Sequence, residues 1–375
     1  MYQALHDLYH RLRGCLTITM IPLNELLLSF PITGVVISED YTSFARHRNE
    51  QYRTWCNEYH VPFHEVANHT LFPLREYVSQ SGTPYQVFAP FYRTVQSKMA
   101  AMTWIPRYDD YSLLTTLPIA NEDIPRDDEP MIGTRDHGLA ILSSLTNHVN
   151  YGTDRNQLTS DGTGLAPYHK FGLISIRETA NAIITHLGFD HELLRQLLWH
   201  DYYYAAPLPV ASLPVASLPV WTNDPDRFNR WSTGTTGYPL IDAGMRQLNQ
   251  TGMIHNRARM LVANFLTSVL DVDWRYGEQY FATHLIDYDP LINHHSWRDV
   301  NNCGLARHRP SSLTYRNGYY RLVYNLKSQA TKYNGIGYIR QWIPELATVP
   351  DRDVLNWDHS RYLRYQQYYD PLPTI

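Results

Sequence analysis

The sequence predicts an α/β domain followed by a larger helical domain, and two observations support this fold class. Near the N-terminus, residues 16–21 and 32–38 have the length and apolar character of buried strands, and residues 23–30 between them suit a helix. Together these segments predict a βαβ unit. Farther along, residues 231–300 place polar and cationic side chains inside otherwise apolar helices. Buried charges are costly unless they face one another or a ligand, so this segment indicates a large polar cofactor.

Composition indicates a globular protein. The chain has 375 residues, of which 43% are hydrophobic and 18% charged, which suffices for one large core or two modest ones. Its 29 tyrosines and nine tryptophans are unusually many, although packing explains most aromatic residues. The net charge of -4 gives no overall attraction to nucleic acid. Any binding of DNA must therefore come from a local patch of arginine and lysine.

The cysteines and histidines predict no metal site. Cys15, Cys56 and Cys303 are odd in number, widely spaced and without a Cys-x-x-Cys pair. Such cysteines fit a reducing, intracellular compartment, cytoplasmic or nuclear. His294 and His295 are adjacent but lack the spaced partners that a metal requires. No run of about 18 apolar residues occurs, so we expect no transmembrane helix and no membrane partner.

Several long segments resemble the photolyase/cryptochrome family. They are residues 162–178 (GTGLAPYHKFGLISIRE), 231–260 (WSTGTTGYPLIDAGMRQLNQTGMIHNRARM), 271–278 (DVDWRYGE), 284–289 (HLIDYD) and 337–346 (GYIRQWIPEL). The resemblance extends from about residue 16 to the C-terminus, and a match of this length is more specific than a short motif. It implies a doubly wound α/β domain followed by a large all-helical domain that holds FAD in a bent conformation.

The resemblance divides the chain into three parts. Residues 1–96 would form a truncated photolyase-type α/β domain, because the first strands of the family are absent from it. Residues 97–150 would be an interdomain connector, and residues 151–375 the helical domain that binds FAD and DNA. A parallel sheet without its first strands exposes a long edge, so we expect either a companion chain or a rebuilt domain. The family holds its antenna pigment in this domain. Because the domain would be truncated here, we expect no antenna pigment.

A glycine-rich loop lies at the position of the family's phosphate loop. A pyrophosphate favours small residues, hydroxyls and free backbone amides at the start of a helix. The five residues with these properties are Gly162, Thr163, Gly164, Leu165 and Ala166. Taken alone, such a loop is more often an ordinary helix entry. The family carries hydroxyls where Gly162 and Ala166 stand, so the resemblance implies a weaker grip on phosphate.

The resemblance assigns further side chains to the flavin ring. Arg259 would pair with Asp287 beside the isoalloxazine, Asp289 would contact the same edge, and Tyr151 would also contact the flavin. Without the resemblance, Arg259 and Asp287 would more often be a structural ion pair. Asn293 takes the position that faces flavin N5, where photolyases carry Asn and many cryptochromes carry Asp or Cys. An amide can hydrogen-bond both neutral and anionic reduced flavin, which favours repair.

Three tryptophans match the family's electron relay, namely Trp297, Trp274 and Trp221. Each indole can give an electron to its oxidised neighbour, so a chain of indoles that reaches the surface lets excited FAD be reduced from outside. A single buried tryptophan is more often part of the core. All three at the matching positions favour the relay.

On the substrate side, photolyases hold a flipped pyrimidine dimer beside the flavin. The resemblance implies that Gln196, Trp199 and Asn293 act in catalysis, with Trp199 as an aromatic wall of the lesion pocket. The residues that it assigns to contacts with DNA are Arg155, Gln196, Trp199, Asn256, Arg257 and Met260.

Three substitutions count against repair. Gln196 replaces a Glu, so it keeps hydrogen bonding but loses the charge, and Met253 replaces a Trp. Asp299 stands where a second stacking Trp is expected, and its carboxylate would repel phosphates. Residues 301–317 are an insertion whose arginines would suit either a loop that contacts DNA or a solvated basic loop.

The leading hypothesis is a deoxyribodipyrimidine photo-lyase that uses FAD and light to reverse cyclobutane pyrimidine dimers in damaged DNA. The alternative is a cryptochrome-like blue-light photoreceptor, which keeps the flavin and the relay but signals through a partner. A third possibility is a scaffold without flavin, which the thinned phosphate loop and the missing strands favour. The colour of the purified protein separates the third hypothesis from the other two.

Overall fold

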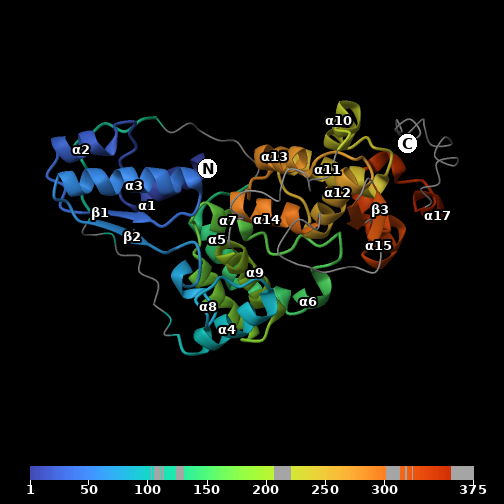
Figure 1. Ribbon diagram of the computed structural model, residues 1–375, viewed down its shortest axis with the longest axis horizontal. Coiled ribbons are helices and arrows are strands. Elements are labelled where there is room, and N and C mark those ends of the chain that lie inside the picture. The colour runs from blue at the N-terminus through green and yellow to red at the C-terminus, as the bar shows by residue number, and fades with distance from the viewer. Residues whose placement is uncertain are drawn as a thin grey trace. The chain divides into compact units, whose positions relative to one another are not determined.

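Figure 1 shows the computed structural model of the chain. It describes residues 1–102, 104, 111, 114–123, 131–206, 221–300, 313–316, 319–322 and 324–355. The chain divides into two compact units. Unit 1 contains Met1–Val149 and Leu165–Ala205, and unit 2 contains Asn150–Gly164 and Ala206–Ile375. Each unit therefore includes two separate stretches of the sequence. The boundaries of the three expected domains stay a prediction.

Unit 1 contains a small parallel sheet. Strand β1 (Val35–Ser38) pairs in parallel with β2 (Phe63–Val66), and helix α3 (Ser43–Glu58) connects them. The side chain of Thr42 caps α3 by accepting a hydrogen bond from the Ala45 amide at 3.2 Å. These elements form a βαβ unit of the predicted type. Among the described residues, this parallel sheet has two strands.

The βαβ unit lies farther along the chain than the sequence predicts. Helix α2 (Leu23–Ser29) forms as expected, but residues 16–21 are not a strand. Instead, the Ile18 amide donates to Asn121 Oδ1 at 2.6 Å, and the Ile18 carbonyl accepts from the Glu122 amide at 2.8 Å. These contacts satisfy the backbone of Ile18 without a strand ladder.

The second predicted strand also differs from the expectation. Residues 32–34 remain outside it, and strand β1 begins at Val35. Its residues alternate between half-buried and exposed positions, and Val36 is 65% exposed. The prediction of a buried strand was therefore wrong, because one face of β1 is exposed. A short apolar run does not reveal which of its faces will be covered.

The rest of unit 1 is helical. Its other helices are α1 (Tyr2–Arg11), α4 (Phe88–Ala100), α5 (Arg135–Ser143), α7 (Ala166–Lys170), α8 (Ile176–Leu187) and α9 (Glu192–Ala205), with 3-10 turns η1 (Leu74–Glu76) and η2 (Leu145–His148). Helix α8 packs against α5 and α9, and α9 packs against α4. A capping box of Ser175 and Glu178 begins α8.

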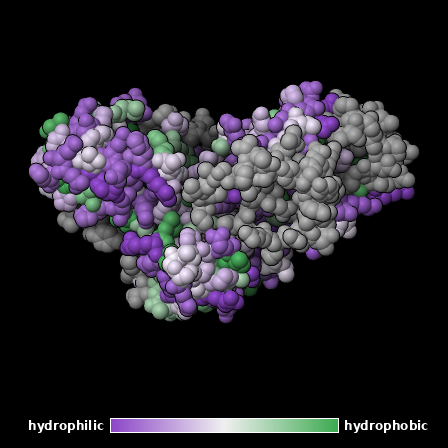
Figure 2. Space-filling view, viewed as in Figure 1, coloured by the Kyte–Doolittle hydropathy of each residue, from purple (hydrophilic) through white to green (hydrophobic). Residues whose placement is uncertain are grey.

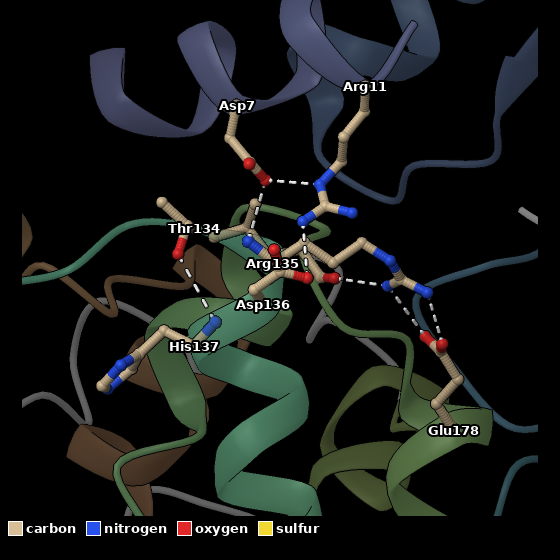
Figure 3. Close-up of polar contacts among 8 residues, drawn as sticks. Asp7, Arg11, Thr134, Arg135, Asp136, His137 and Glu178 are labelled. Atoms are coloured by element: carbon tan, nitrogen blue, oxygen red, sulfur yellow. Dashed lines mark hydrogen bonds and ion pairs between the residues drawn. The ribbon is translucent and has the colours of Figure 1, made fainter.

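Ion pairs link α1, α5 and α8 (Figure 3). Asp7 accepts hydrogen bonds from Arg11 Nε and from the backbone amide of Arg135, each at 2.9 Å. Arg11 also pairs with Asp136 at 2.7 Å, and Arg135 pairs with Glu178 at 2.6 Å. Helix α1 itself has no fully buried residue. Polar contacts therefore contribute much of its attachment.

Unit 2 is built mainly of helices around one apolar core. They are α6 (Tyr151–Asp154), α10 (Pro225–Thr233), α11 (Pro239–Thr251), α12 (Asn256–Ser268), α13 (Trp274–His284), α14 (Pro290–Val300), α15 (Leu326–Lys332), α16 (Gly335–Trp342) and α17 (Asp351–Val354), with a 3-10 turn η4 (Pro344–Leu346). Helices α11 and α12 are buried along most of their length. They pack against each other and form the centre of this unit.

An antiparallel hairpin completes unit 2. Strand β3 (Leu313–Arg316) pairs with β4 (Tyr319–Leu322). Most of the expected insertion, residues 301–312 and 317, lies outside the described residues. The segment 313–316 belongs to this hairpin.

The described surface is mostly hydrophilic on the face that Figure 2 shows. On the face shown in Figure 2, hydrophobic residues lie in small groups between hydrophilic ones. Scattered hydrophobic residues are normal on a folded protein. In the described part of the chain, no helix has both the length and the apolar character that a membrane span requires.

Candidate functional site

One buried carboxylate organises the turn before α11. Asp242 is 0% exposed and accepts hydrogen bonds from the Thr236 amide at 2.8 Å, the Thr236 hydroxyl at 2.6 Å and the Gly237 amide at 2.9 Å. Gly237 has a φ of 86°, which favours glycine. Burial raises the pKa of Asp242 to about 7, and the hydrogen bonds from Thr236 and Gly237 oppose that rise. This arrangement fixes the start of α11.

Arg259 and Asp287 form the ion pair that the sequence predicts. Arg259 Nη2 lies 2.8 Å and 3.1 Å from the two carboxylate oxygens of Asp287, and its Nε donates to the Ile254 carbonyl at 3.0 Å. The Asp287 side chain is 8% exposed and that of Arg259 28% exposed. Contacts at two edges hold the guanidinium in one orientation. The pair thus holds the Arg259 guanidinium in a fixed orientation beside the first turn of α12.

The segment after Asp287 leads into α14. Asp289 Oδ1 accepts hydrogen bonds from the backbone amides of Leu291 and Ile292, each at 3.0 Å. Asp289 therefore satisfies free amides at the start of α14. Asn293 lies one turn later and is buried, and its Nδ2 donates to the Glu278 carbonyl on α13 at 3.1 Å. This bond fixes the orientation of the Asn293 amide.

Positive charge gathers at the start of α12. His255 caps this helix, since its Nδ1 accepts from the Arg257 amide at 3.1 Å. Burial lowers the pKa of His255 to about 4, and Arg257, Arg259 and Arg155 add repulsion against a charged ring. The ring is therefore neutral at pH 7. The guanidinium of Arg257 stacks over Tyr333, with 4.4 Å to the ring centroid.

Arg257 is also tied to the stretch of unit 2 that precedes the glycine-rich loop. Its Nη2 donates to Asn156 Oδ1. Nearby, the Leu158 amide donates to the Tyr333 carbonyl at 2.9 Å. Of the predicted DNA contacts on α12, Asn256 is exposed, and Arg257 and Met260 are half-buried.

The glycine-rich loop has the backbone geometry that a phosphate site needs. Gly162 and Gly164 have φ values of 64° and 68°, and nothing lies within 4 Å of a Cβ built on either residue. The open space leaves room for a ligand to approach the backbone closely. Thr163 is half-buried, Leu165 buried and Ala166 exposed. Tyr151 begins α6 and is half-buried.

Trp297 lies inside the core of unit 2. It is 2% exposed and meets the ring of Trp231 edge-on, with 6.3 Å between centroids, and that of Phe281 at 5.1 Å. Its indole also lies directly against Gly277 of α13. Trp297 thus packs against α13 at Gly277, about one helical turn from the position of Trp274 on the same helix.

Hydrogen bonds join the segments that carry the other two tryptophans of the predicted relay. The amides of Thr222 and Asn223 donate to the Asp271 carbonyl at 3.1 Å and 3.3 Å. Asn223 Oδ1 in turn accepts from the Asp273 amide at 2.8 Å. Trp221 directly precedes Thr222, and Trp274 directly follows Asp273. Both indoles are half-buried and lie on neighbouring backbone segments of unit 2.

The predicted lesion-side residues Gln196 and Trp199 lie on α9 of unit 1. Trp199 stacks on Phe88, with 3.7 Å between centroids and 7° between ring planes. Gln196 Nε2 donates to Glu192 Oε1 at 2.7 Å. Neither Phe88 nor Glu192 is among the predicted residues. The spacing of four residues could have revealed Glu192, whereas Phe88 is too distant in sequence for any such signal.

The residues present fit FAD. The loop glycines leave space for phosphate, and Arg259 offers a positive charge that its own carboxylate partner already orients. Within the described residues, no group of three histidine, cysteine, aspartate or glutamate side chains could hold a metal ion.

Comparison with known proteins identifies the family. Residues 19–108 match the family model described as DNA photolyase, and residues 193–371 match the FAD binding domain of DNA photolyase. A deoxyribodipyrimidine photo-lyase of Alkalihalophilus pseudofirmus is 31% identical over 386 residues, which cover 94% of this chain and 78% of the relative. The chain belongs to the DNA photolyase family. The predicted family and its cofactor, FAD, are thereby confirmed.

Two other photolyases are also similar to this chain. A deoxyribodipyrimidine photo-lyase of Synechococcus is 29% identical, with 88% of this chain and 73% of the relative covered. An archaeal photolyase from Sulfolobus tokodaii, crystallised with two FAD molecules, matches with a TM-score of 0.74, 29% identity and coverage of 100% and 84%.

Two structural relatives below 25% identity confirm the fold class. A class III photolyase from Agrobacterium tumefaciens has a TM-score of 0.83 at 22% identity and covers 99% of this photolyase and 83% of its own chain. A cryptochrome from Synechocystis has a TM-score of 0.80 at 21% identity, with coverage of 100% and 84%. This photolyase accordingly has the predicted α/β part, reduced to a small parallel sheet, and the helical FAD-binding part.

Proposed function

We propose that this photolyase repairs cyclobutane pyrimidine dimers in DNA by light-driven electron transfer. The carrying observation is the fixed Arg259–Asp287 pair in the same unit as the oriented amide of Asn293. When bound, reduced FAD supplies an electron on absorption of blue light, and that electron splits the dimer and then returns. The reaction therefore consumes no net electrons.

Each residue in the proposal has a defined task. Arg259 places a permanent positive charge beside the cofactor, which stabilises an anionic reduced ring. Asn293 offers an amide that hydrogen-bonds the ring without adding charge. Trp297, Trp274 and Trp221 pass electrons inward to restore the reduced cofactor after oxidation.

On the DNA side, the positive start of α12 supports binding to phosphates. Arg155, Arg257 and Arg259 surround the neutral His255 there, and Asn256 is exposed beside them. Trp199 would stack on an unpaired base of the lesion, and Gln196 and Met260 would contact it. Phe88 stacks on Trp199 and thereby orients its ring.

Repair of irradiated oligonucleotides tests the proposal. Fully reduced protein is mixed with a thymine-dimer oligonucleotide, and dimers are counted by chromatography after blue light or darkness. We expect loss of dimers only in the light, and a strong reduction of that loss in Arg259→Gln. Arg246→Gln is the matched control, because Arg246 forms an ion pair with Glu345 of the same unit and has no proposed role in catalysis. Unchanged dimers in the light would contradict repair.

A cryptochrome-like photoreceptor is the second candidate. The observation that favours it is the internal bonding of the lesion-side groups, since Gln196 bonds Glu192 and Trp199 stacks on Phe88. Such a photoreceptor would be photoreduced efficiently yet would bind damaged and undamaged DNA equally. Competition binding with the two DNAs, measured beside the repair assay, separates the candidates. A colourless protein that does not take up FAD would instead support the flavin-free scaffold.

Two expectations remain predictions, namely a companion chain and an intracellular location. A companion chain would associate with the parallel sheet of unit 1, and size-exclusion chromatography of the protein from its natural source would detect it. The intracellular location rests on the cysteine pattern.

A further inference from the structure

A line of aromatic rings leaves Trp297 in a direction that bypasses Trp274. Trp231 meets Trp297 edge-on at 6.3 Å, and Tyr280 meets Trp231 edge-on at 5.7 Å between centroids. Tyr280 then stacks on His284 at 3.9 Å. Trp231 is fully buried, whereas Tyr280 is half-buried. The contacts thus lead from the core of unit 2 to its surface within one compact unit.

The surroundings of Trp231 suit a transient electron donor. Its indole N–H donates to the Val262 carbonyl at 2.9 Å, and a backbone carbonyl is not a base. An oxidised Trp231 would therefore keep its proton and could regain an electron without a proton transfer. Packing alone explains why Trp231 is buried. Packing does not require an oxidisable ring on each side of it, as Trp297 and Tyr280 are here.

Tyr280 can end the line because its hydroxyl is both held and close to solvent. The hydroxyl lies 2.9 Å from Asn249 Oδ1 and 3.0 Å from the Ser232 carbonyl, either of which can accept its hydrogen bond. Burial raises the pKa of Tyr280, so the phenol is protonated at neutral pH. Loss of an electron makes a phenol strongly acidic, and the proton would then pass to water at the partly exposed edge.

We propose that Trp231 and Tyr280 form a second branch of the electron relay, which leads from Trp297 to the surface without passing through Trp274. This inference rests on the proposed function, in which Trp297 gives an electron to the light-excited oxidised cofactor. Trp231 then gives one electron to oxidised Trp297, and Tyr280 gives one to oxidised Trp231. Tyr280 releases its phenolic proton to water, and an external thiol restores it with one electron and one proton.

The branch predicts a tyrosyl radical that depends on one position. Flavin-loaded, oxidised protein is illuminated with thiol present, the cofactor's absorbance is followed, and radicals are trapped for electron paramagnetic resonance. Ring-deuterated tyrosine identifies a tyrosyl signal by its narrowed lines. In Trp274→Phe, which blocks the predicted relay, we expect continued but slower photoreduction and a stronger tyrosyl signal. Adding Tyr280→Phe should remove that signal and slow photoreduction by a further factor on the order of ten.

Tyr276→Phe in the Trp274→Phe background is the matched control. Tyr276 lies one turn earlier on α13, is 52% exposed, and contacts Phe228, whose ring is far harder to oxidise. It should leave both the signal and the rate unchanged. Trp231→Phe should act like Tyr280→Phe, and if its loss of packing prevents folding, Tyr280→Phe decides alone.

The outcomes separate the branch from the proposed function. If wild type is photoreduced but Tyr280→Phe changes neither the radical nor the rate in the Trp274→Phe background, the branch is overturned and the predicted relay stands. If the tyrosyl signal follows Tyr276 instead, the branch is likewise overturned. A wild-type protein that holds flavin but shows neither photoreduction nor repair would overturn the proposed function together with the branch.

Discussion

Asp242 illustrates how one side chain sets a local conformation. Its carboxylate accepts three hydrogen bonds in a fully buried turn. In Asp242→Asn, the amide group would point a donor at another donor, so we expect the free energy of unfolding to fall by about 1–3 kcal/mol. Urea denaturation measures this change. The control is Asp226→Asn at an exposed position in α10, and equal stability of the two variants would contradict the prediction.

Single residues were predictable from the sequence where a long match fixes their neighbours. The pairing of Arg259 with Asp287 is of this kind, and the structure shows it at hydrogen-bond distance. The stack of Trp199 on Phe88 was not predictable, because the two residues are far apart in sequence and either ring alone suits any core. The roles assigned to both sets beside FAD and DNA remain predictions.

At the level of elements, the cap of α12 makes stability depend on pH. The pKa of His255 is about 4 in the folded protein against 6.5 for an ordinary histidine. Between these values the unfolded chain binds a proton that the folded chain does not, so stability falls as the pH is lowered from 6.5 to 4. The loss from this residue reaches about 3 kcal/mol at the lower end.

Urea unfolding at several pH values measures that effect. His255→Asn keeps a side chain that can cap the helix but does not titrate. Its stability should therefore depend less on pH than that of wild type over this window. The comparison isolates His255 from other titrating groups, such as His169, whose pKa burial lowers to about 3. Parallel curves for the two proteins would show that His255 is not responsible.

Helices α13 and α14 approach closely at Gly277. A Cβ there would lie 2.6 Å from Leu266 Cδ2 and closer still to the indole of Trp297. We expect Gly277→Ala to lower the free energy of unfolding by about 1–3 kcal/mol through overpacking. A shift in tryptophan fluorescence should accompany it. Gly34→Ala is the control, because its nearest neighbour is the Pro62 carbonyl at an ordinary 3.8 Å. An unperturbed Gly277→Ala would mean that the helices separate easily.

Element type was more predictable than element position. Helix α2 formed where its composition indicated, and it packs against α3 with Leu27 buried. The strand expected at residues 16–21 failed because strands depend on partners, and its backbone found Asn121 and Glu122 instead. Helix α1 was missed because a hydrogen bond and an ion pair to α5, which is distant in sequence, help to hold it.

For the molecule as a whole, the net negative charge opposes binding to DNA, which is also negatively charged. The net charge is -4, so affinity for DNA must come from the local positive charge at the start of α12. Plotting the logarithm of the binding constant against that of salt concentration should give a negative slope, which Arg257→Gln reduces by about 1. Lys327→Gln, an exposed position on α15, should not change it. Equal slopes for both variants would place the phosphate contacts elsewhere.

The division of unit 2 between two stretches of chain affects its folding during synthesis. Thr159 bonds Asn334 across 175 residues of sequence, and the Leu158 amide bonds the Tyr333 carbonyl nearby. A ribosome needs roughly 10–35 s to add that many residues. Throughout this interval the early stretch has emerged while its partners do not yet exist. Nascent chains therefore require protection there, and synonymous codons that slow translation between the two stretches should lower the yield of active protein.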